Sequence, residues 1–110
     1  MQLHYLEVSK TARYAVLGEL SSHTRHVWFV CHGYGQLAAP FIEYFHPLDD
    51  GYNYIVAPEA LARFYTKRME GRVGATWMTK EDRQTDITDY VRYLDQLYGE
   101  VFSRIPRSQV

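Results

Sequence analysis

The chain has 110 residues, a formal net charge of −1 and a balanced set of 12 basic and 13 acidic side chains. This length corresponds to a single domain, and an apolar fraction of 46% is enough for a hydrophobic core. The near-neutral charge argues against nucleic acid as a partner, because binding to phosphates requires an excess of basic residues.

Cysteine usage and hydropathy indicate the compartment. Cys31 is the single cysteine, so no disulfide can form within the chain, and a reducing compartment is favoured. No segment approaches the ~18 apolar residues that a membrane-spanning helix needs, and the first residues lack the continuous apolar stretch of a signal peptide. We therefore expect a cytoplasmic protein without a membrane span.

The first predicted element is a hairpin of two antiparallel strands. Residues 3–8 and 12–20 both alternate apolar and polar side chains, and a short polar segment, "SKT", separates them. Such alternation is typical of strands with one solvated face. Residues 27–31, "VWFVC", are instead apolar at every position, which is typical of a central parallel strand covered on both faces.

A helix and a second parallel strand are predicted next. Leu37, Phe41, Tyr44 and Phe45 share one helical face, and Pro40 is acceptable only in the first turn, so the helix should begin near residue 37 or 38. Residues 53–58, "NYIVAP", form the second short apolar run. The order strand, glycine loop, helix, strand predicts a crossover unit.

Residues 59–78 give no clear periodicity and are interpreted as a long loop with a helical turn. A loop of this length inside a compact domain usually has a function. A helix should follow, with Thr79 and Asp82 as a capping box. Its apolar stripe has helical spacing and comprises Ile87, Tyr90, Val91, Leu94, Tyr98 and Val101.

The segment "HGYG" (residues 32–35) joins the apolar strand to the first helix, so it lies at the carboxyl end of the strand. Open α/β sheets bind their ligands at this edge. The segment is not a dinucleotide fingerprint, because the third glycine is missing. It is not a phosphate loop either, because no Gly-Lys-Ser/Thr follows it. An oxyanion loop remains, in which a backbone N–H stabilises a carbonyl oxygen that becomes negative. The alternative is a plain turn.

The isolated reactive side chains favour structural roles. His32 is interpreted as a packing or hydrogen-bonding residue of the loop, and Cys31 as a buried structural thiol, because neighbours in a strand point to opposite faces. The five histidines are scattered, and a metal site would need a third ligand that the sequence does not identify. We predict neither a metal nor a cofactor.

Several segments in order resemble the carboxylesterase and acyl-protein-thioesterase branch of the α/β-hydrolases. They are "VWFVCHGYGQLAAPFIEYF", "YIVAPEA", "GATWM", the acidic helix from Thr79, and "RIPRSQV", which is similar to the lead-in to a nucleophile strand. The resemblance implies an α/β fold and, more narrowly, the N-terminal half of an α/β-hydrolase: an antiparallel hairpin, then parallel strands with crossover helices. It also implies hydrolysis of small carboxylic esters or thioesters.

The resemblance assigns the oxyanion donor to the backbone N–H of Tyr34. Gly33 and Gly35 would give the substrate carbonyl room, Gln36 would begin the segment beside the pocket, and Trp77 would line the acyl side. No Gly-x-Ser-x-Gly occurs in the chain. We therefore expect residues 1–110 to be a partial domain that ends before the nucleophile strand and is inactive alone.

Two other functions stay open. The chain could be a non-catalytic α/β module that self-associates, because a strand at residues 27–31 needs a neighbour on each side, and a second copy could cover a free edge as a homodimer. It could also bind a small molecule or phosphate through the same glycine loop.

Overall fold

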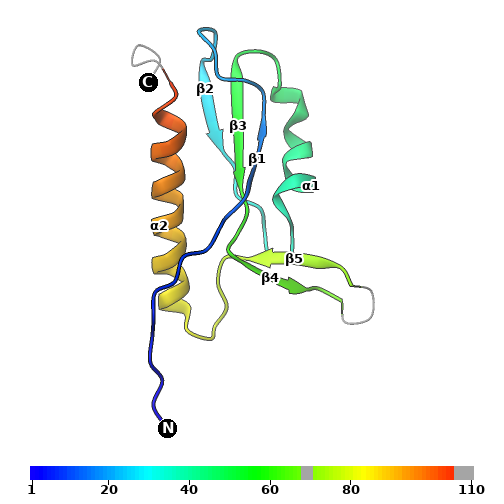
Figure 1. Ribbon diagram of the computed structural model, residues 1–110. Helices are drawn as coiled ribbons and strands as arrows, with labels where there is room; N and C mark the ends of the chain where they lie inside the picture. The colour runs from blue at the N-terminus through cyan, green and yellow to red at the C-terminus, as the bar shows by residue number, and fades with distance from the viewer. Residues whose placement is uncertain (68–70, 106–110) are drawn as a thin grey trace.

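The computed structural model describes residues 1–67 and 71–105, and it has an α/β fold. A three-stranded sheet contains β1 (Tyr14–Leu17), β3 (Asn53–Pro58) and β2 (His26–Phe29), in that order. A separate two-stranded sheet contains β4 (Ala62–Tyr65) and β5 (Val73–Thr76). The helices are α1 (Ala38–Ile42), the 3₁₀ helix η1 (Glu43–Leu48) and α2 (Arg83–Phe102) (Figure 1).

Strand β3 is the centre of the main sheet. It pairs antiparallel with β1 and parallel with β2, with Ile55 opposite both Leu17 and Trp28. Its residues from Tyr54 onward are buried on both faces, which explains why every position in "YIVAP" is apolar.

Alternate β3 side chains pack against different helices. Tyr54 and Val56 join the core cluster built with α2, and Ile55 and Ala57 join the cluster built with α1. The two helices accordingly lie on opposite sides of the sheet in Figure 1. The result is three layers, helix, sheet and helix, as the period-two alternation of a strand requires.

The prediction of a crossover unit is confirmed in its element order. Residues 53–58 form β3, and α1 begins at Ala38 with Pro40 in its first turn. The apolar face of this segment is shifted, however. Ala38 and Ile42 are the buried residues of α1, whereas Tyr44 is exposed, because the chain tightens into a 3₁₀ helix after Ile42 and this changes the direction of later side chains.

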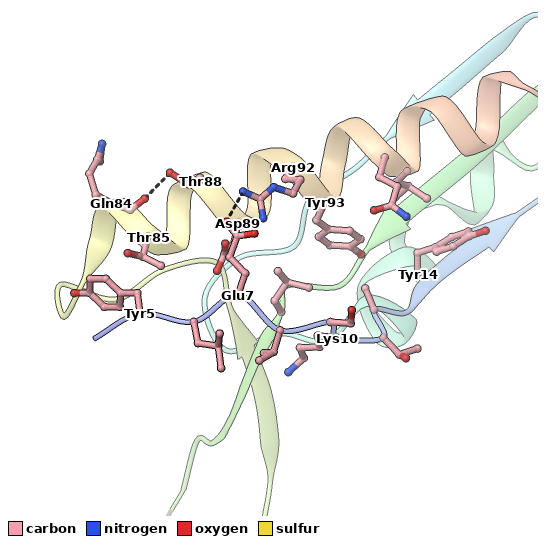
Figure 2. Close-up of a pocket in the computed structure, with 18 of the residues that line it drawn as sticks. Tyr5, Glu7, Lys10, Tyr14, Gln84, Thr85, Thr88, Asp89, Arg92 and Tyr93 are labelled. Atoms are coloured by element: carbon pink, nitrogen blue, oxygen red, sulfur yellow. Dashed lines mark hydrogen bonds and ion pairs between the residues drawn. The ribbon is translucent and has the colours of Figure 1, made fainter. Parts of the chain in front are cut away.

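The predicted N-terminal hairpin is wrong in its first strand. Residues 3–8 form no strand, and the partner of β1 is β3. The apolar side chains of residues 1–8 are exposed, so this segment packs neither face against the core. Alternation of apolar and polar residues was therefore not sufficient to predict a strand here. The segment runs beside α2, and Figure 2 shows the groove between them, which Glu7 and Arg92 span with an ion pair of 3.6 Å.

The position of residues 27–31 also differs from the prediction. The strand covers His26–Phe29 and lies at the edge of the described sheet, with β3 as its one strand neighbour there. Val27 and Phe29 pack toward α2, but Trp28 remains partly exposed. The strand that is covered on both faces is β3.

The predicted long loop at residues 59–78 is instead mostly the β4–β5 hairpin, although residues 68–70 lie outside the described residues. Arg63 pairs with Ala75, and Phe64 with Gly74. In Figure 1 the hairpin lies at the end of the main sheet where β2 and β3 terminate.

Helix α2 is present but begins later than predicted. Its first residue is Arg83, and Asp82 adopts a left-handed conformation with φ of 57° without a side-chain cap. Thr79 donates its hydroxyl to the Glu81 carbonyl, so the predicted Thr79–Asp82 capping box does not form. The proposed lead-in at residues 104–110 lies, from residue 106, outside the described residues.

The apolar stripe of α2 is rotated from the predicted one. Leu97, which the prediction omitted, is buried together with Val101, whereas Val91 and Tyr98 are largely exposed. Within the described residues, none of the three helices combines the length and apolar character that crossing a bilayer requires.

Candidate functional site

The glycine loop lies at the carboxyl edge of the main sheet. Residues 32–36 follow β2, and Glu59 and Ala60 follow β3. Because β2 and β3 are parallel, both segments emerge at the same edge. This is the edge at which open α/β sheets place ligands.

The loop itself is a β-turn over residues 33–36. The Gln36 amide donates to the Gly33 carbonyl at 3.2 Å, and Gly35, the third residue of the turn, has φ of +76°. A positive φ at the third position alone defines a type II turn, which glycine adopts without steric cost. The second glycine of "HGYG" is therefore required by the turn itself.

Hydrogen bonds hold three of the four turn amides. Gly33 N–H donates to Oε1 of Gln36 at 2.5 Å, Gly35 N–H donates to the Ala75 carbonyl at 2.9 Å, and Gln36 N–H closes the turn. The Tyr34 N–H has no hydrogen-bond partner among residues 1–67 and 71–105. A β-turn does not use the N–H of its second residue, so this donor is left for solvent or a ligand.

Strand β5 fixes the loop from the other side. The Ala75 amide donates to the Gln36 carbonyl at 2.9 Å, and the two residues form an antiparallel bridge. The contact is so close that a Cβ atom on Gly74 would clash with the Gly35 carbonyl. Gly74 thus permits the hairpin to hold the turn, a relationship that nothing in the local sequence indicated.

His32 is buried, with 3% of its surface exposed, and both its ring nitrogens are used. The Ala60 amide donates to Nε2 at 3.0 Å, so Nδ1 carries the proton and donates to the Gly33 carbonyl at 2.8 Å. The imidazole therefore links the end of β3 to the turn as a neutral ring. It is not free to act as a general base, which agrees with the structural role predicted for it.

Trp77 lies against the inner side of the same loop. Its indole N–H donates to the His32 carbonyl at 2.9 Å, and its ring stacks on the imidazole with centroids 5.2 Å apart. The structure thus brings Trp77 to the glycine loop, and its role in lining the acyl side stays a prediction. Its polar atom and one ring face are occupied by His32.

Glu59 is a buried carboxylate that the sequence analysis missed. It is 3% exposed; its Oε2 accepts from Arg13 Nε at 2.5 Å, and its Oε1 accepts from the Ala38 amide at 3.2 Å. Leu37 provides no side-chain cap, so Glu59 supplies the acceptor at the start of α1. The available signal was a lone acid inside the apolar run "IVAPEALA".

The charges around Glu59 decide its protonation. Burial by itself would raise the pKa of this carboxyl group, but the hydrogen bonds from Arg13 and Ala38, with the charges of Arg13 and Arg63, hold the pKa below its usual value. The Arg63 guanidinium lies 3.7 Å from Oε2. Glu59 is therefore an ionised structural group and not a proton donor near neutral pH.

The outer side of the turn carries an aromatic pair that the sequence analysis did not identify. The Tyr34 ring lies 5.1 Å from the Phe64 ring, at an angle of 39°. Tyr34 is 74% exposed. Phe64 was missed because its strand, β4, was interpreted as part of a loop.

Cys31 differs from its prediction, because its side chain is exposed and not buried. Partial burial of the thiol nevertheless raises its pKa, which keeps it protonated and weakly nucleophilic near neutral pH. In the part of the chain that the structure describes, no three His, Cys, Asp or Glu side chains come close enough to hold a metal ion.

The comparisons with known proteins add no relative. No protein-family model, no curated protein and no solved structure matches this chain. The chemistry of the site thus depends on its geometry: a fixed turn presents one N–H beside two aromatic rings.

Proposed function

We propose that residues 32–36 are the oxyanion loop of a serine carboxylesterase or thioesterase of the α/β-hydrolase type. The observation that carries the proposal is the Tyr34 N–H, the turn amide without a partner among the described residues. The order β2, glycine loop, α1, β3 and the α/β layering support it as well. The antiparallel β1 and the parallel β2 and β3 are compatible with part of a hydrolase sheet.

The rigidity of the loop matters for this function. An oxyanion donor is effective when it is fixed before the reaction, because no reorganisation is then needed as charge develops. His32, Gln36 and Ala75 hold the peptide groups on either side of Tyr34. One such donor contributes roughly a 10²- to 10³-fold increase in rate.

The proposal does not assign a nucleophile within the chain. No Gly-x-Ser-x-Gly is present, and both nitrogens of His32 are engaged. A hydrogen-bond donor alone cannot form an acyl-enzyme, so residues 1–110 should not turn over an ester. Burst kinetics with an activated ester on this chain would contradict the proposal.

A direct test uses methylphosphonate, a tetrahedral anion that resembles the ester-hydrolysis intermediate. In ¹H–¹⁵N spectra of the full chain at near-neutral pH, titration should shift the Tyr34 amide more than those of Gly33, Gly35 and Gln36. A Tyr34 amide that does not respond would refute the oxyanion role. If inorganic phosphate binds as tightly as methylphosphonate, the result favours the alternative in which the glycine loop binds phosphate.

A second test concerns the coding DNA. An in-frame Gly-x-Ser-x-Gly downstream of Val110, followed by aspartate and histidine, would supply the missing triad. Its absence would contradict the hydrolase proposal.

A self-associating module remains the second candidate function, and the edge position of β2 favours it. The amides of His26 and Val30 point toward β3, so those of Val27 and Phe29 face away from it by alternation. Tyr98 on the neighbouring side of α2 is 54% exposed. Light scattering after size exclusion should then report a dimer that Tyr98→Asp disrupts and Tyr44→Asp does not, and a monomeric wild-type chain would exclude this candidate.

A further inference from the structure

The aromatic pair of Tyr34 and Phe64 includes the residue whose turn amide has no partner among residues 1–67 and 71–105. Both the N–H and the ring belong to Tyr34, so a ligand oxygen bound to this N–H brings its substituents close to that ring. Phe64 extends the same surface, with its ring centroid 5.1 Å from that of Tyr34. The turn amide and two aromatic rings therefore lie within one residue and its direct neighbour.

The position of the pair is fixed by the backbone of the turn. The point where a Cβ atom of Gly35 would stand lies 3.6 Å from Cγ2 of Thr66 and 3.9 Å from Cζ of Phe64. Thr66 directly follows β4 and continues its alternation, so Phe64 and Thr66 share the face that meets the turn and Tyr65 does not. Tyr65 points to the other face and is itself exposed.

We propose that Tyr34 and Phe64 bind the aromatic group of an aryl ester whose carbonyl oxygen accepts from the Tyr34 N–H. This inference rests on the proposed oxyanion function and names the substrate class for it. The site takes a ligand with an oxygen acceptor and a flat aromatic group within one or two bonds of the reacting carbon.

An aromatic group fits this surface better than an alkyl chain. Aromatic rings gain a directional stacking interaction on an open ring face, in addition to the area that they bury. An alkyl chain gains affinity mainly from enclosure, whereas the groove between residues 5–12 and α2 in the described part of the chain has neither Tyr34 nor Phe64 in its lining.

The roles of the two aromatic partners of the loop therefore differ. The indole of Trp77 is occupied by the ring and carbonyl of His32 and supports the loop from inside. The ring of Tyr34 projects outward, and its hydroxyl has no hydrogen-bond partner in the described residues. Tyr34, more than Trp77, should determine which ester is preferred.

The test compares phenylphosphonate, butylphosphonate and methylphosphonate by titration of the amide signal of residue 34 in the full chain. Phenylphosphonate should bind about twofold to tenfold more tightly than methylphosphonate, the range that one aromatic contact contributes. Tyr34→Ala retains the backbone N–H but removes the ring, so this preference should disappear. Tyr65→Ala, a matched exposed tyrosine on β4, should retain it.

The outcomes separate the inference from the function on which it rests. If methylphosphonate shifts the residue-34 amide but phenylphosphonate binds no more tightly, the aromatic site is refuted while the oxyanion role stands. Butylphosphonate binding as tightly as phenylphosphonate would likewise refute the aromatic preference. If neither methylphosphonate nor phenylphosphonate shifts this amide, the oxyanion role fails, and the inference fails with it.

Discussion

Arg13 and Glu59, 46 residues apart in the chain, form a hydrogen-bonded ion pair with Nε 2.5 Å from Oε2. The carboxylate is buried, whereas the guanidinium is more than half exposed. The Glu59 amide also donates to the Arg13 carbonyl at 3.1 Å. The pair thus fixes the chain entering β1 against the chain leaving β3, immediately behind the glycine loop.

Removal of the Glu59 charge should destabilise the fold. Glu59→Gln replaces a buried acceptor of two charge-assisted bonds, and we expect a loss of about 1–3 kcal/mol in the free energy of unfolding. Urea denaturation measures this loss. The control is Glu100→Gln, which removes an exposed ion pair with Arg104 just beyond the end of α2 and should cause a much smaller change.

The same carboxylate predicts how stability depends on pH. Because the pKa of Glu59 is lower in the folded chain, the folded state binds fewer protons than the unfolded state in acid. Its stabilisation is complete above the ordinary glutamate pKa of about 4.3 and is lost as pH falls through the lower, folded value. Denaturation curves from pH 6 to 2 should fall less steeply for Glu59→Gln than for the wild type, and parallel curves would contradict this.

Tyr93 should ionise later than an ordinary tyrosine. Burial of its phenol raises its pKa to about 12, and its hydroxyl donates to the Arg13 carbonyl at 3.2 Å. The folded state therefore retains this proton while the unfolded state loses it, so stability should decrease as pH rises from about 10 to 12. Ultraviolet titration should show a late component that Tyr93→Phe removes, and a late component of unchanged size in Tyr93→Phe would contradict this.

His32 should stabilise the loop through its acceptor nitrogen. His32→Leu leaves the buried Ala60 N–H without its partner, and the expected loss is about 1–3 kcal/mol. It also removes the ring on which Trp77 stacks, so the tryptophan emission should change. His23→Leu, at an exposed turn position, provides the control, and equal stability of the two variants would refute this role for His32.

Two glycine-to-alanine substitutions should change the stability of the fold in opposite directions. Gly74→Ala places a methyl group against the backbone of Gly35, so it should destabilise the chain and shift the Tyr34 amide signal. Gly99→Ala lies in α2 with no atom within 4 Å of the new Cβ, and it should stabilise the helix by about 0.5–1 kcal/mol. Thermal unfolding of both variants measures the two changes in stability. A stabilising effect of Gly74→Ala would exclude the close contact between Gly74 and the Gly35 backbone.

Local sequence patterns were sufficient for several elements. The apolar run at residues 53–58 identified β3 without error in its bounds, and the spacing of apolar residues identified both helices. The HGYG motif indicated a turn after β2, where Gly35 does adopt a positive φ. These features succeed because a short run of side chains determines them, through burial, periodicity or a steric requirement.

The remaining features of the fold were decided by contacts between residues that are distant in the sequence. Alternation at residues 3–8 could not show that β1 would pair with β3, and "VWFVC" did not reveal that β2 lies at the edge of the described sheet. The stripe on α2 shifted toward Leu97 because the position of the sheet, not helix periodicity alone, determines which face is buried. The β4–β5 hairpin was missed because residues 59–78 give no clear strand periodicity, and its place beside the turn depends on the close approach of Gly74 to Gly35.

The candidate site divides in the same way. By itself the sequence determined a glycine turn at the end of an apolar strand, and its resemblance to a known family, not the turn pattern, predicted the Tyr34 amide as the donor. Only the tertiary structure brought Glu59, Ala75 and Phe64 to that turn, from segments more than 20 residues away. Turn geometry follows from local steric limits, whereas the groups that fix and flank the turn depend on how sheet, helix and hairpin pack together.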